Sequence, residues 1–539
     1  MRDESQAAEL HGCLLDEPMI RWRCVADGEL HRSSLPDLMA AMVANEVRDF
    51  PALRPHQRHP WHAFLTQLAV IALYRAGQPQ VWLRADEWRQ ALLDLTPDDP
   101  DGAAWCLVTP QERPALLQPA VSGESVASWK NVLHAADELD MLVTSMNHDV
   151  KAARARLGEA DDWLFSLVSL QTQAGSLGAG NYGVSRMNGG FASRPGVGVA
   201  MTGDWGQRWS ADTRQLLANR EQIVDAHGFT AEQGHALLWL QPWDGATSID
   251  MASLDPFYIE VCRRVRMAVV KGRFTARVTG SKVARLAAKE RNGVTGDAWT
   301  PLETTVGKAL TVSAAGFDYR LMSELLSGDR FAHGAAWRFD GWSQEVRLEI
   351  VAQVTVRGKG KTEGFHERRI PVSTKLRRLL AGPQRMTVAE MAKQRIAAIA
   401  AVRKLLWGSL CLLFANGDGG DRNDSISDRA QRFARPFEQH EDARFFVDLT
   451  AEVEAEDGER SNQRVQWSLG LVDRAEAVLK EAFLAGPRSG MQRYKAQAAA
   501  LSRFHAGLRG TKPVLPDLAS HYAEQRAARA ALPEGEQHG

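Results

Sequence analysis

Basic side chains gather between residues 263 and 291, where Glu290 is the one acid among them. Lysine and arginine at this density can neutralise the phosphates of a nucleic acid, although a run of charge can equally be a solvated protein face. Within the run, Val270–Val278 has the pattern of a β-strand, so part of the patch would lie on a sheet. The basic residues are Arg263, Arg264, Arg266, Lys271, Arg273, Arg277, Lys282, Arg285, Lys289 and Arg291.

Glycines gather in a second stretch, Ala174–Gly183, directly after a helical pattern that spans Trp163–Gln173. Such a loop could hold nucleotide phosphates, which would make the protein a nucleotide-binding hydrolase that uses residues 175–183. Dinucleotide and P-loop motifs, however, follow a strand and open a helix, and no Gly-Lys-Ser/Thr ending is present. The alternative is a backbone surface without side chains that another molecule approaches closely.

A third stretch runs from Val346 to Val372. Its first half alternates apolar and polar residues, which predicts a β-strand. The glycine-rich segment 358–364 follows, and the chain then resumes an extended pattern at Phe365–Ile370. We therefore predict a long β-hairpin with a flexible, basic tip. The tip is either an ordinary solvated loop or a probe that reaches into a polyanion.

Other polar groups carry weaker signals. Three histidines within residues 54–62 could ligate a metal, but two prolines interrupt a continuous helix there and no acid is close by, so packing at a helix entry is the alternative. Asn147 and His148 could hydrogen-bond base edges or cap a loop. The five cysteines form no CxxC pair, which argues against a thiolate zinc site; they are Cys13, Cys24, Cys106, Cys262 and Cys411.

Composition narrows the class of protein. The length of 539 residues allows two or three domains, and 44% apolar with 24% charged residues is ordinary for a soluble globular chain. The formal net charge is -1, so any site for a polyanion must be a local patch. A polar N-terminus without a signal peptide, and an apolar run at Phe64–Tyr74 too short to span a bilayer, predict a cytoplasmic protein that does not enter a membrane.

Helical patterns dominate the region after the hairpin. They span Val388–Ala415, Phe445–Glu454, Asn462–Ala485 and Gly490–Leu508, with Asn416–Asp424 as a linker. Four antiparallel helices predict an up-down bundle. The last of them would turn one stripe inward, formed by Met491, Tyr494, Ala498, Leu501 and Leu508. We therefore predict an α+β fold: a large mixed α/β domain in residues 1–378, which includes the hairpin, and a four-helix bundle in residues 379–539.

These pieces, in this order, resemble the large subunit of the type I-E CRISPR effector Cascade, the CasA family. The resemblance covers nearly the whole chain, and its specificity comes from the order of motifs that are each weak alone. The motifs are Leu14–Ile20 followed by Asp27-Gly28, the helix and glycines of Gln173–Gly183, Lys271–Thr275, the hairpin that ends in Glu367–Arg369, and the terminal bundle.

The resemblance implies a DNA-reading subunit that is not a catalyst and needs no cofactor or metal. The family reads the protospacer-adjacent motif of target double-stranded DNA from the minor groove and separates the strands so that the crRNA can invade and form an R-loop. It also presents a surface for the helicase-nuclease that degrades the target. The implied partners are therefore the other Cascade subunits, crRNA, the target duplex and that nuclease.

The resemblance also assigns residues by position. The residues that face the minor groove would be Gly178, Ala179, Gly180, Asn181, Lys271 and Arg273, with Arg273 where the family carries a lysine. The strand-separating wedge would be Gly360, Lys361 and Thr362. A loop that contacts DNA and the complex would include Asn147 and His148. The family's wedge is often a glutamine, whereas here Gln353 lies too far down the strand, so the tip would act through charge and bulk.

Overall fold

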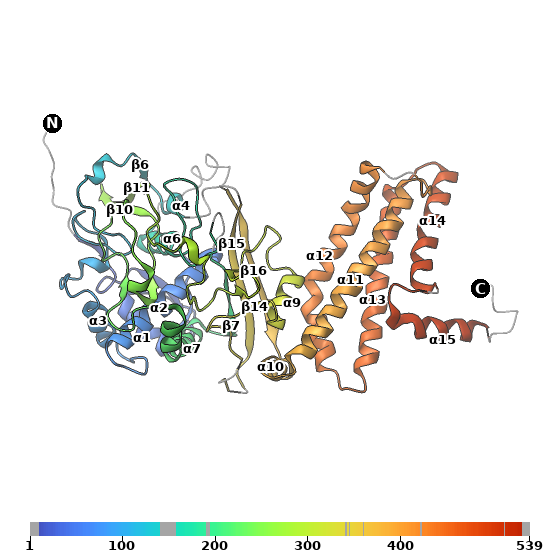
Figure 1. The fold of residues 1–539 in the computed structure, drawn as a ribbon, viewed down its shortest axis with the longest axis horizontal. Helices are drawn as coiled ribbons and strands as arrows, with labels where there is room; N and C mark the ends of the chain where they lie inside the picture. The colour runs from blue at the N-terminus through green and yellow to red at the C-terminus, as the bar shows by residue number, and fades with distance from the viewer. Residues whose placement is uncertain are drawn as a thin grey trace. The chain divides into compact units, whose positions relative to one another are not determined.

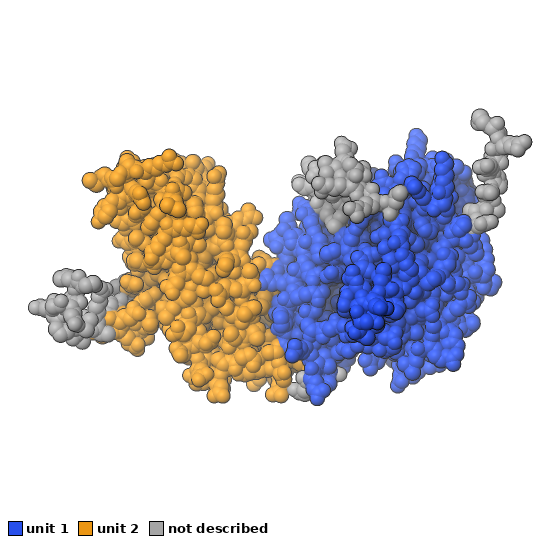
Figure 2. Space-filling model, turned by 180° about the vertical axis from the view of Figure 1, so that it is seen from behind, with its two compact units in different colours: residues 1–317, 328–372 blue, residues 318–327, 373–539 orange. Residues whose placement is uncertain are grey.

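The computed structural model describes residues 10–140, 158–189, 194–339, 342–343, 345–358, 361–420, 423–510 and 512–530. The chain divides into two compact units, which Figure 2 distinguishes by colour. Unit 1 consists of Met1–Phe317 and Gly328–Val372, and unit 2 consists of Asp318–Ser327 and Ser373–Gly539. Residues 318–327 are distant in sequence from the rest of unit 2, so only tertiary contacts place them there.

Unit 1 mixes short strands and helices (Figure 1), as the predicted α+β class requires. Its described α-helices are α1 (Leu35–Val43), α2 (Arg58–Arg75), α3 (Ala85–Asp94), α4 (Ala136–Leu139), α6 (Ala160–Gln173), α7 (Trp205–Ala218) and α8 (Arg220–His227). Its described strands are β1 (His11–Cys13), β2 (Ile20–Cys24), β3 (Leu30–Ser33), β4 (Val47–Asp49), β5 (Cys106–Val108), β6 (Asn131–Leu133), β7 (Gly196–Met201), β8 (His235–Leu237), β9 (Leu254–Ile259), β10 (Arg264–Val270), β11 (Arg273–Thr279), β12 (Leu302–Glu303), β13 (Lys308–Ala309), β14 (Phe331–Ala332), β15 (Leu348–Gly358) and β16 (Lys361–Val372).

The strands form several small sheets rather than one large one. β11 lies between β10 and β6, β15 between β16 and β7, and β2 between β3 and β4, all with antiparallel pairing. β12 pairs with β13 and β14, and β1 pairs with β5, again antiparallel. β8 and β9 form a parallel pair. The helices of unit 1 therefore pack around separate sheets, and α2 supplies the common core.

Helix α2 is buried on every side, because each residue from His59 to Leu73 is buried. A helix without a polar face belongs in the interior of a domain. The histidines at its entry have separate partners: His56 Nε2 lies 2.8 Å from Asp140 Oδ1, and His62 Nε2 lies 2.7 Å from Asp212 Oδ2. The His59 ring meets the edge of Trp299, with ring centroids 5.6 Å apart. This arrangement favours packing over a shared metal site.

β15 and β16 form the predicted hairpin, and β7 continues the sheet on the far side of β15 (Figure 1). Ile350, Ala352 and Val354 are buried on one face of β15, as the alternation predicts. Val351 and Gln353 on the opposite face are buried as well. The lower half of the hairpin is thus an interior strand pair with both faces covered, which gives its tip a rigid base.

Unit 2 contains the predicted bundle. Its described helices are α9 (Tyr319–Ser327), α10 (Thr374–Ala381), α11 (Arg385–Phe414), α12 (Asp424–Glu454), α13 (Arg460–Glu481), α14 (Gly490–Arg509) and α15 (Ala519–Ala530). α11 is the central helix and packs against α12, α13 and α14. Its predicted inward positions, Ile399, Val402, Leu406, Leu410 and Leu413, are all buried. The predicted four-helix bundle is confirmed.

Two details of the bundle differ from the prediction. α12 begins at Asp424 rather than near Phe445, because the Asn423 side chain caps it by accepting a 3.0 Å hydrogen bond from Ile426 N. On α14, Leu508 is buried as predicted, but Met491, Tyr494 and Ala498 are exposed. The other inward residues are Ala496, Ala500 and Phe504. Small residues let α14 approach α11 closely: a Cβ added to Gly507 would lie 2.5 Å from a methyl group of Leu405.

Helix α11 is also long and apolar enough to cross a membrane, with a mean hydropathy of 1.7 over its most apolar window. Central helices of folded bundles meet the same criteria. α11 moreover carries Arg395, which is buried and pairs with Glu452 on α12 at 2.6 Å. A charged side chain paired inside the unit marks α11 as the core helix of this bundle.

Candidate nucleic-acid interface

The glycine-rich stretch forms a closed excursion from the end of α6. Its two ends meet where Val184 N donates to Ala174 O at 3.0 Å. Inside it, Asn181 N donates to Gly178 O at 3.0 Å and Leu177 N donates to Asn181 O at 2.9 Å. Gly178 and Gly180 have φ of +111° and +83°, values that side chains with a Cβ rarely adopt. Gly178–Asn181 is therefore a tight turn with an exposed Ala179 at its tip.

This turn packs by its backbone on the residues that follow β11. Ser281 N donates to Gly180 O at 2.9 Å, and the Tyr182 hydroxyl donates to Lys282 O at 2.9 Å. The approach favours glycine at position 280, since a Cβ added to Gly280 would lie 3.2 Å from Gly180 O. Lys282 is exposed next to this contact. The structure thus places Lys282 beside the glycine turn. From the sequence alone, Lys282 belonged only to the basic run.

Lys271 and Arg273 lie elsewhere. They flank Gly272 in the tight turn between β10 and β11, where Val270 pairs with Arg273, and both side chains are exposed. β11 runs from this turn to Thr279, and six residue steps of an extended strand span ~20 Å. The predicted set is therefore split: the glycine turn and Lys282 lie at one end of β11, and Lys271 and Arg273 lie at the other.

The basic run is less uniform than its sequence indicates. Arg266 donates to Thr109 O at 3.0 Å, and Arg285 donates to Gln241 O at 2.6 Å, so both guanidinium groups hold neighbouring loops. Burial lowers the pKa of each of these arginines to about 10. Arg264 pairs with Glu124. Arg263 donates to Gly175 O at 2.6 Å and so secures the start of the glycine stretch. These four cations are structural rather than part of a phosphate-binding face.

The hairpin passes the same end of α6 from which the glycine stretch departs. A small cavity there is lined by Gln173, the last residue of α6, together with Val354, Thr355 and Phe365 of the hairpin. The Phe365 ring also meets the edge of His56, with centroids 6.4 Å apart. Beyond Thr355, β15 continues to Gly358, a further ~10 Å at the rise of an extended strand. The glycine turn and the hairpin tip thus both extend from the region of unit 1 around the C-terminal end of α6.

At the tip, Gly358 pairs with Lys361 and Arg357 pairs with Thr362, after a bulge at Val356/Arg357. Lys361 and Thr362 are therefore the first two residues of β16, and their backbones pair with β15 directly after the turn. Gly360 lies outside the described residues, as do Asn147 and His148. Further down, Gln353 Nε2 donates to Glu367 Oε2 at 2.8 Å, which keeps this glutamine in the strand pair and away from the tip.

The overall fold is shared with known structures. No protein-family model matches the sequence, and no curated protein is similar to it in sequence. CRISPR-associated protein Cse1 from Acidimicrobium ferrooxidans, however, matches over 96% of this chain and 99% of its own, with a TM-score of 0.60 and 16% identity. The chain has the Cse1 (CasA) fold. This result confirms, for the fold, the resemblance that the order of motifs predicted.

Other solved structures with the Cse1 fold agree. Thermus thermophilus CasA (Cse1) matches over 92% of this chain and 99% of its own, with a TM-score of 0.61 and 15% identity. Thermobifida fusca Cse1 matches over 92% and 96%, again with a TM-score of 0.61 and 15% identity. A chain of a CRISPR RNA-guided surveillance complex matches over 92% of this chain and 100% of its own, with a TM-score of 0.56 and 12% identity.

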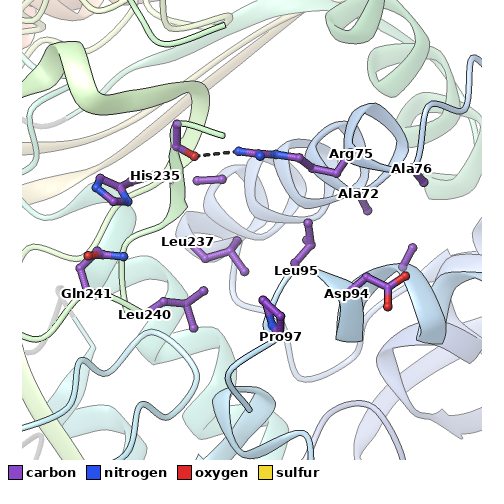
Figure 3. A pocket seen from close by; sticks show the side chains of 13 residues that line it. Ala72, Arg75, Ala76, Asp94, Leu95, Pro97, His235, Leu237, Leu240 and Gln241 are labelled. Carbon is purple, nitrogen blue, oxygen red and sulfur yellow. Dashed lines mark hydrogen bonds between the residues drawn. The ribbon is translucent and has the colours of Figure 1, made fainter. Parts of the chain in front are cut away.

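The sizes of two cavities argue against the alternative of a nucleotide-binding hydrolase that uses residues 175–183. The cavity beside the glycine turn, lined by Leu177, Asn181 and Gly280 among others, measures about 160 Å³. Small-molecule sites are commonly larger, at roughly 300–1,000 Å³. A cavity of about 410 Å³ lies between α2, α3 and β8 (Figure 3), where Arg75 donates to Gly234 O at 2.8 Å, but no residue of the stretch 175–183 lines it. The glycine turn therefore presents backbone at a surface rather than enclosing a nucleotide.

A buried polar cluster holds the far end of the glycine stretch. Ser185 N donates to Glu260 Oε1 at 2.6 Å, and the Ser185 hydroxyl lies 2.9 Å from Glu260 Oε2 and 2.7 Å from the Tyr258 hydroxyl. Burial raises the pKa of Glu260 to about 7, although hydrogen bonds from Ser185 and the charge of Arg186 act in the opposite direction. The residue that follows the glycine stretch is thus held by a buried carboxyl group whose pKa is raised by burial.

Proposed function

We propose that this chain is the large subunit of a type I-E CRISPR surveillance complex, Cascade, and that it reads the protospacer-adjacent motif of target double-stranded DNA. The observation that carries the proposal is the Cse1 fold over 96% of the chain, in which a glycine turn follows α6 and a long hairpin packs beside the same end of that helix. The glycine turn presents little side-chain bulk, and the lower half of the hairpin is buried on both faces of β15. That combination suits close contact with a DNA groove.

Recognition would begin at the glycine turn. Gly178, Ala179, Gly180 and Asn181 would approach the minor groove by backbone, since Ala179 is exposed and the turn is held from behind by Ser281 and Tyr182. Lys282, whose backbone contacts this turn, would reach into the groove. Narrow minor grooves concentrate negative potential and attract a cation.

Lys271 and Arg273 would serve a different contact. At ~20 Å from the glycine turn, about the length of β11, they would meet the phosphate backbone of the flanking duplex rather than the same motif. Phosphate contacts position a protein on DNA without reading its sequence. We therefore assign motif reading to the glycine turn with Lys282, and sequence-independent affinity to Lys271 and Arg273.

Strand separation would fall to the hairpin tip, with Gly360, Lys361 and Thr362 as the wedge, and Asn147 and His148 would contribute a further DNA contact. Unstacking a base step costs roughly a few kcal/mol, which inserted groups and backbone contacts offset. Exchange of duplex for crRNA heteroduplex is then close to balanced, so a local push decides whether invasion starts. Burial of both faces of β15 supplies the rigid support that such a push needs.

The complex would supply most of the affinity. With a net charge of -1, the chain alone has little general attraction for DNA. Held in a cytoplasmic complex with crRNA and the other Cascade subunits, its local contacts would act at high effective concentration. After R-loop formation the subunit would recruit the helicase-nuclease, and it would not itself be a catalyst.

Co-expression with the other Cascade subunits and a crRNA tests this function. We expect the chain to co-purify with the crRNA-containing assembly, and the assembly to bind a duplex with the motif far more tightly than one with a scrambled motif. Omitting the chain should remove this discrimination while leaving the RNA-containing remainder intact. A chain that elutes apart from the RNA, or a complex that discriminates equally well without it, would contradict the proposal.

A further inference from the structure

Two cysteines face each other across β1 and β5, far from the proposed DNA contacts in sequence. Cys13 and Cys106 are direct partners in the antiparallel register. Both sulfur atoms approach the same carbonyl oxygen, that of Gly102, at 4.0 Å for Cys13 and 3.5 Å for Cys106. Side chains of directly opposed residues lie on the same face of a sheet, so the two thiols are neighbours.

The pair occupies the type of position that accepts a disulfide. Cys13 N donates to Glu17 Oε1 at 2.9 Å, and Cys106 O accepts from Leu116 N at 2.9 Å, so the two residues do not exchange backbone hydrogen bonds with each other. The adjacent bond, Leu14 N to Trp105 O at 3.0 Å, closes the ladder beside them. Opposed residues of this kind have Cα atoms ~4.5 Å apart, within the ~4.4–6.8 Å that a disulfide spans.

The environments of the two thiols differ in a way that sets the order of reaction. Cys13 is half-buried, whereas Cys106 is fully buried. A hydrogen bond with the Cys106 thiol lowers the pKa of Cys13, against the opposing effects of burial and of the Asp16 carboxylate. The same hydrogen bond, together with burial, raises the pKa of Cys106. Cys13 is therefore the accessible nucleophile, and Cys106 is the thiol that resolves an intermediate.

We propose that Cys13 and Cys106 are a modification site that a low-molecular-weight disulfide oxidises to an intramolecular disulfide. The Cys13 thiolate attacks one sulfur of the oxidant, the oxidant's S–S bond breaks, and one thiolate leaves. Cys106 then loses its proton to solvent and attacks Cys13 Sγ, which expels the second thiolate. Both released thiolates take up protons, so two protein thiols are oxidised by two electrons and the oxidant becomes two thiols.

The new bond would tie the N-terminal strand to the interior of unit 1. It would close the chain between residues 13 and 106, a long loop, and long loops give the largest loss of freedom in the unfolded chain. Oxidation should therefore raise the melting temperature of the protein. Because strand pairing already holds the two residues opposite each other, little rearrangement of β1 and β5 is required.

The test exposes the full-length chain, folded under reducing conditions, to oxidised glutathione and analyses it by alkylation and mass spectrometry. We expect the loss of two free thiols and two hydrogen atoms per chain, a cross-linked peptide pair containing Cys13 and Cys106, a higher melting temperature, and full reversal by dithiothreitol. Cys24→Ser is the matched control, because Cys24 is also half-buried but stands opposite Val47 in its strand pair. It should behave as wild type.

Single substitutions separate the two roles. Cys13→Ser should block the reaction, and Cys106→Ser should stop it with glutathione attached to Cys13. Cys106→Ala replaces the latter variant if serine at the buried position prevents folding. Glutathione that remains on wild-type Cys13, a cross-link through another cysteine, or an unchanged thiol count would each overturn the proposal.

Discussion

Gly180→Ala is the substitution that best isolates the glycine turn. A Cβ at this position would lie 3.6 Å from Gly280 Cα and 3.7 Å from Ser281 O, which are ordinary contact distances, so packing alone tolerates alanine. The backbone does not, since φ is +83°. Placing a residue with a Cβ in a left-handed conformation costs roughly 1–2 kcal/mol.

This strain raises the free energy of the turn in its native conformation, which is the conformation proposed to bind DNA. A strain of one to two kcal/mol reduces the population of the native turn, relative to relaxed conformations, by a factor of about 5–30. The apparent dissociation constant of the assembled complex for motif-bearing duplex should rise, by at most about the same factor. Binding to a duplex with a scrambled motif should change little, because we propose that the turn reads the motif and does not supply general affinity.

Fluorescence anisotropy of labelled duplexes with the complete crRNA-loaded complex provides the assay. Gly189→Ala is the matched control, because a Cβ there meets nothing within 4 Å and its φ is not in the left-handed region. This control should bind as wild type. Wild-type affinity of the Gly180→Ala complex for the motif duplex would refute the role of the turn, as would an equal loss on both duplexes.

Four further variants test other parts of the account. Lys282→Ala should reduce the preference for motif over scrambled duplex, whereas Arg273→Ala should weaken both duplexes alike and lower the salt slope of binding by about one; the reverse pattern would contradict our division of the basic run. Shortening the tip, residues 358–364, should spare initial binding but slow strand opening, as 2-aminopurine beside the motif reports; equal opening rates would remove the wedge. Glu260→Gln should change how the free energy of unfolding depends on pH. The folded-state pKa of about 7 exceeds the ordinary 4.5, so the folded chain binds the extra proton and wild type loses stability as pH rises between these values. The variant should lack this loss of up to ~3 kcal/mol in thermal melts from pH 4 to 8, and an unchanged pH slope would show that Glu260 does not titrate there.

Local patterns in the sequence predicted much of the fold. The hairpin follows from alternation at 346–356 and the glycines after it, and the α11 stripe follows from its helical spacing. Elements with polar surfaces were harder: the first half of α12 has few apolar residues, and its start depends on the cap at Asn423. The α14 stripe was mispredicted because small residues, Ala496 and Ala500, face α11 where larger ones were expected.

The site was predictable only in part, for a physical reason. The glycine turn is a local feature, and its positive φ values could be inferred from glycine content. Its neighbour Lys282 could not, because the Ser281 to Gly180 bond joins residues about a hundred positions apart. Buried arginines such as Arg266 and Arg285 look like surface charge in a sequence, since their partners are backbone carbonyls of other loops. Long-range contacts, rather than residue types, decide which cations remain exposed at the surface.

Site-specific photo-cross-linking tests the central claim most directly. A photoreactive amino acid at Ala179, the exposed tip of the glycine turn, would be incorporated into the crRNA-loaded complex, with Leu83, which is 76% exposed in unit 1, as the control position. The account predicts cross-links from position 179 to the motif base pairs of the target duplex, which disappear when the motif is scrambled, and none from position 83. Cross-links from position 179 that ignore the motif, or their complete absence in a complex that binds the duplex, would contradict it.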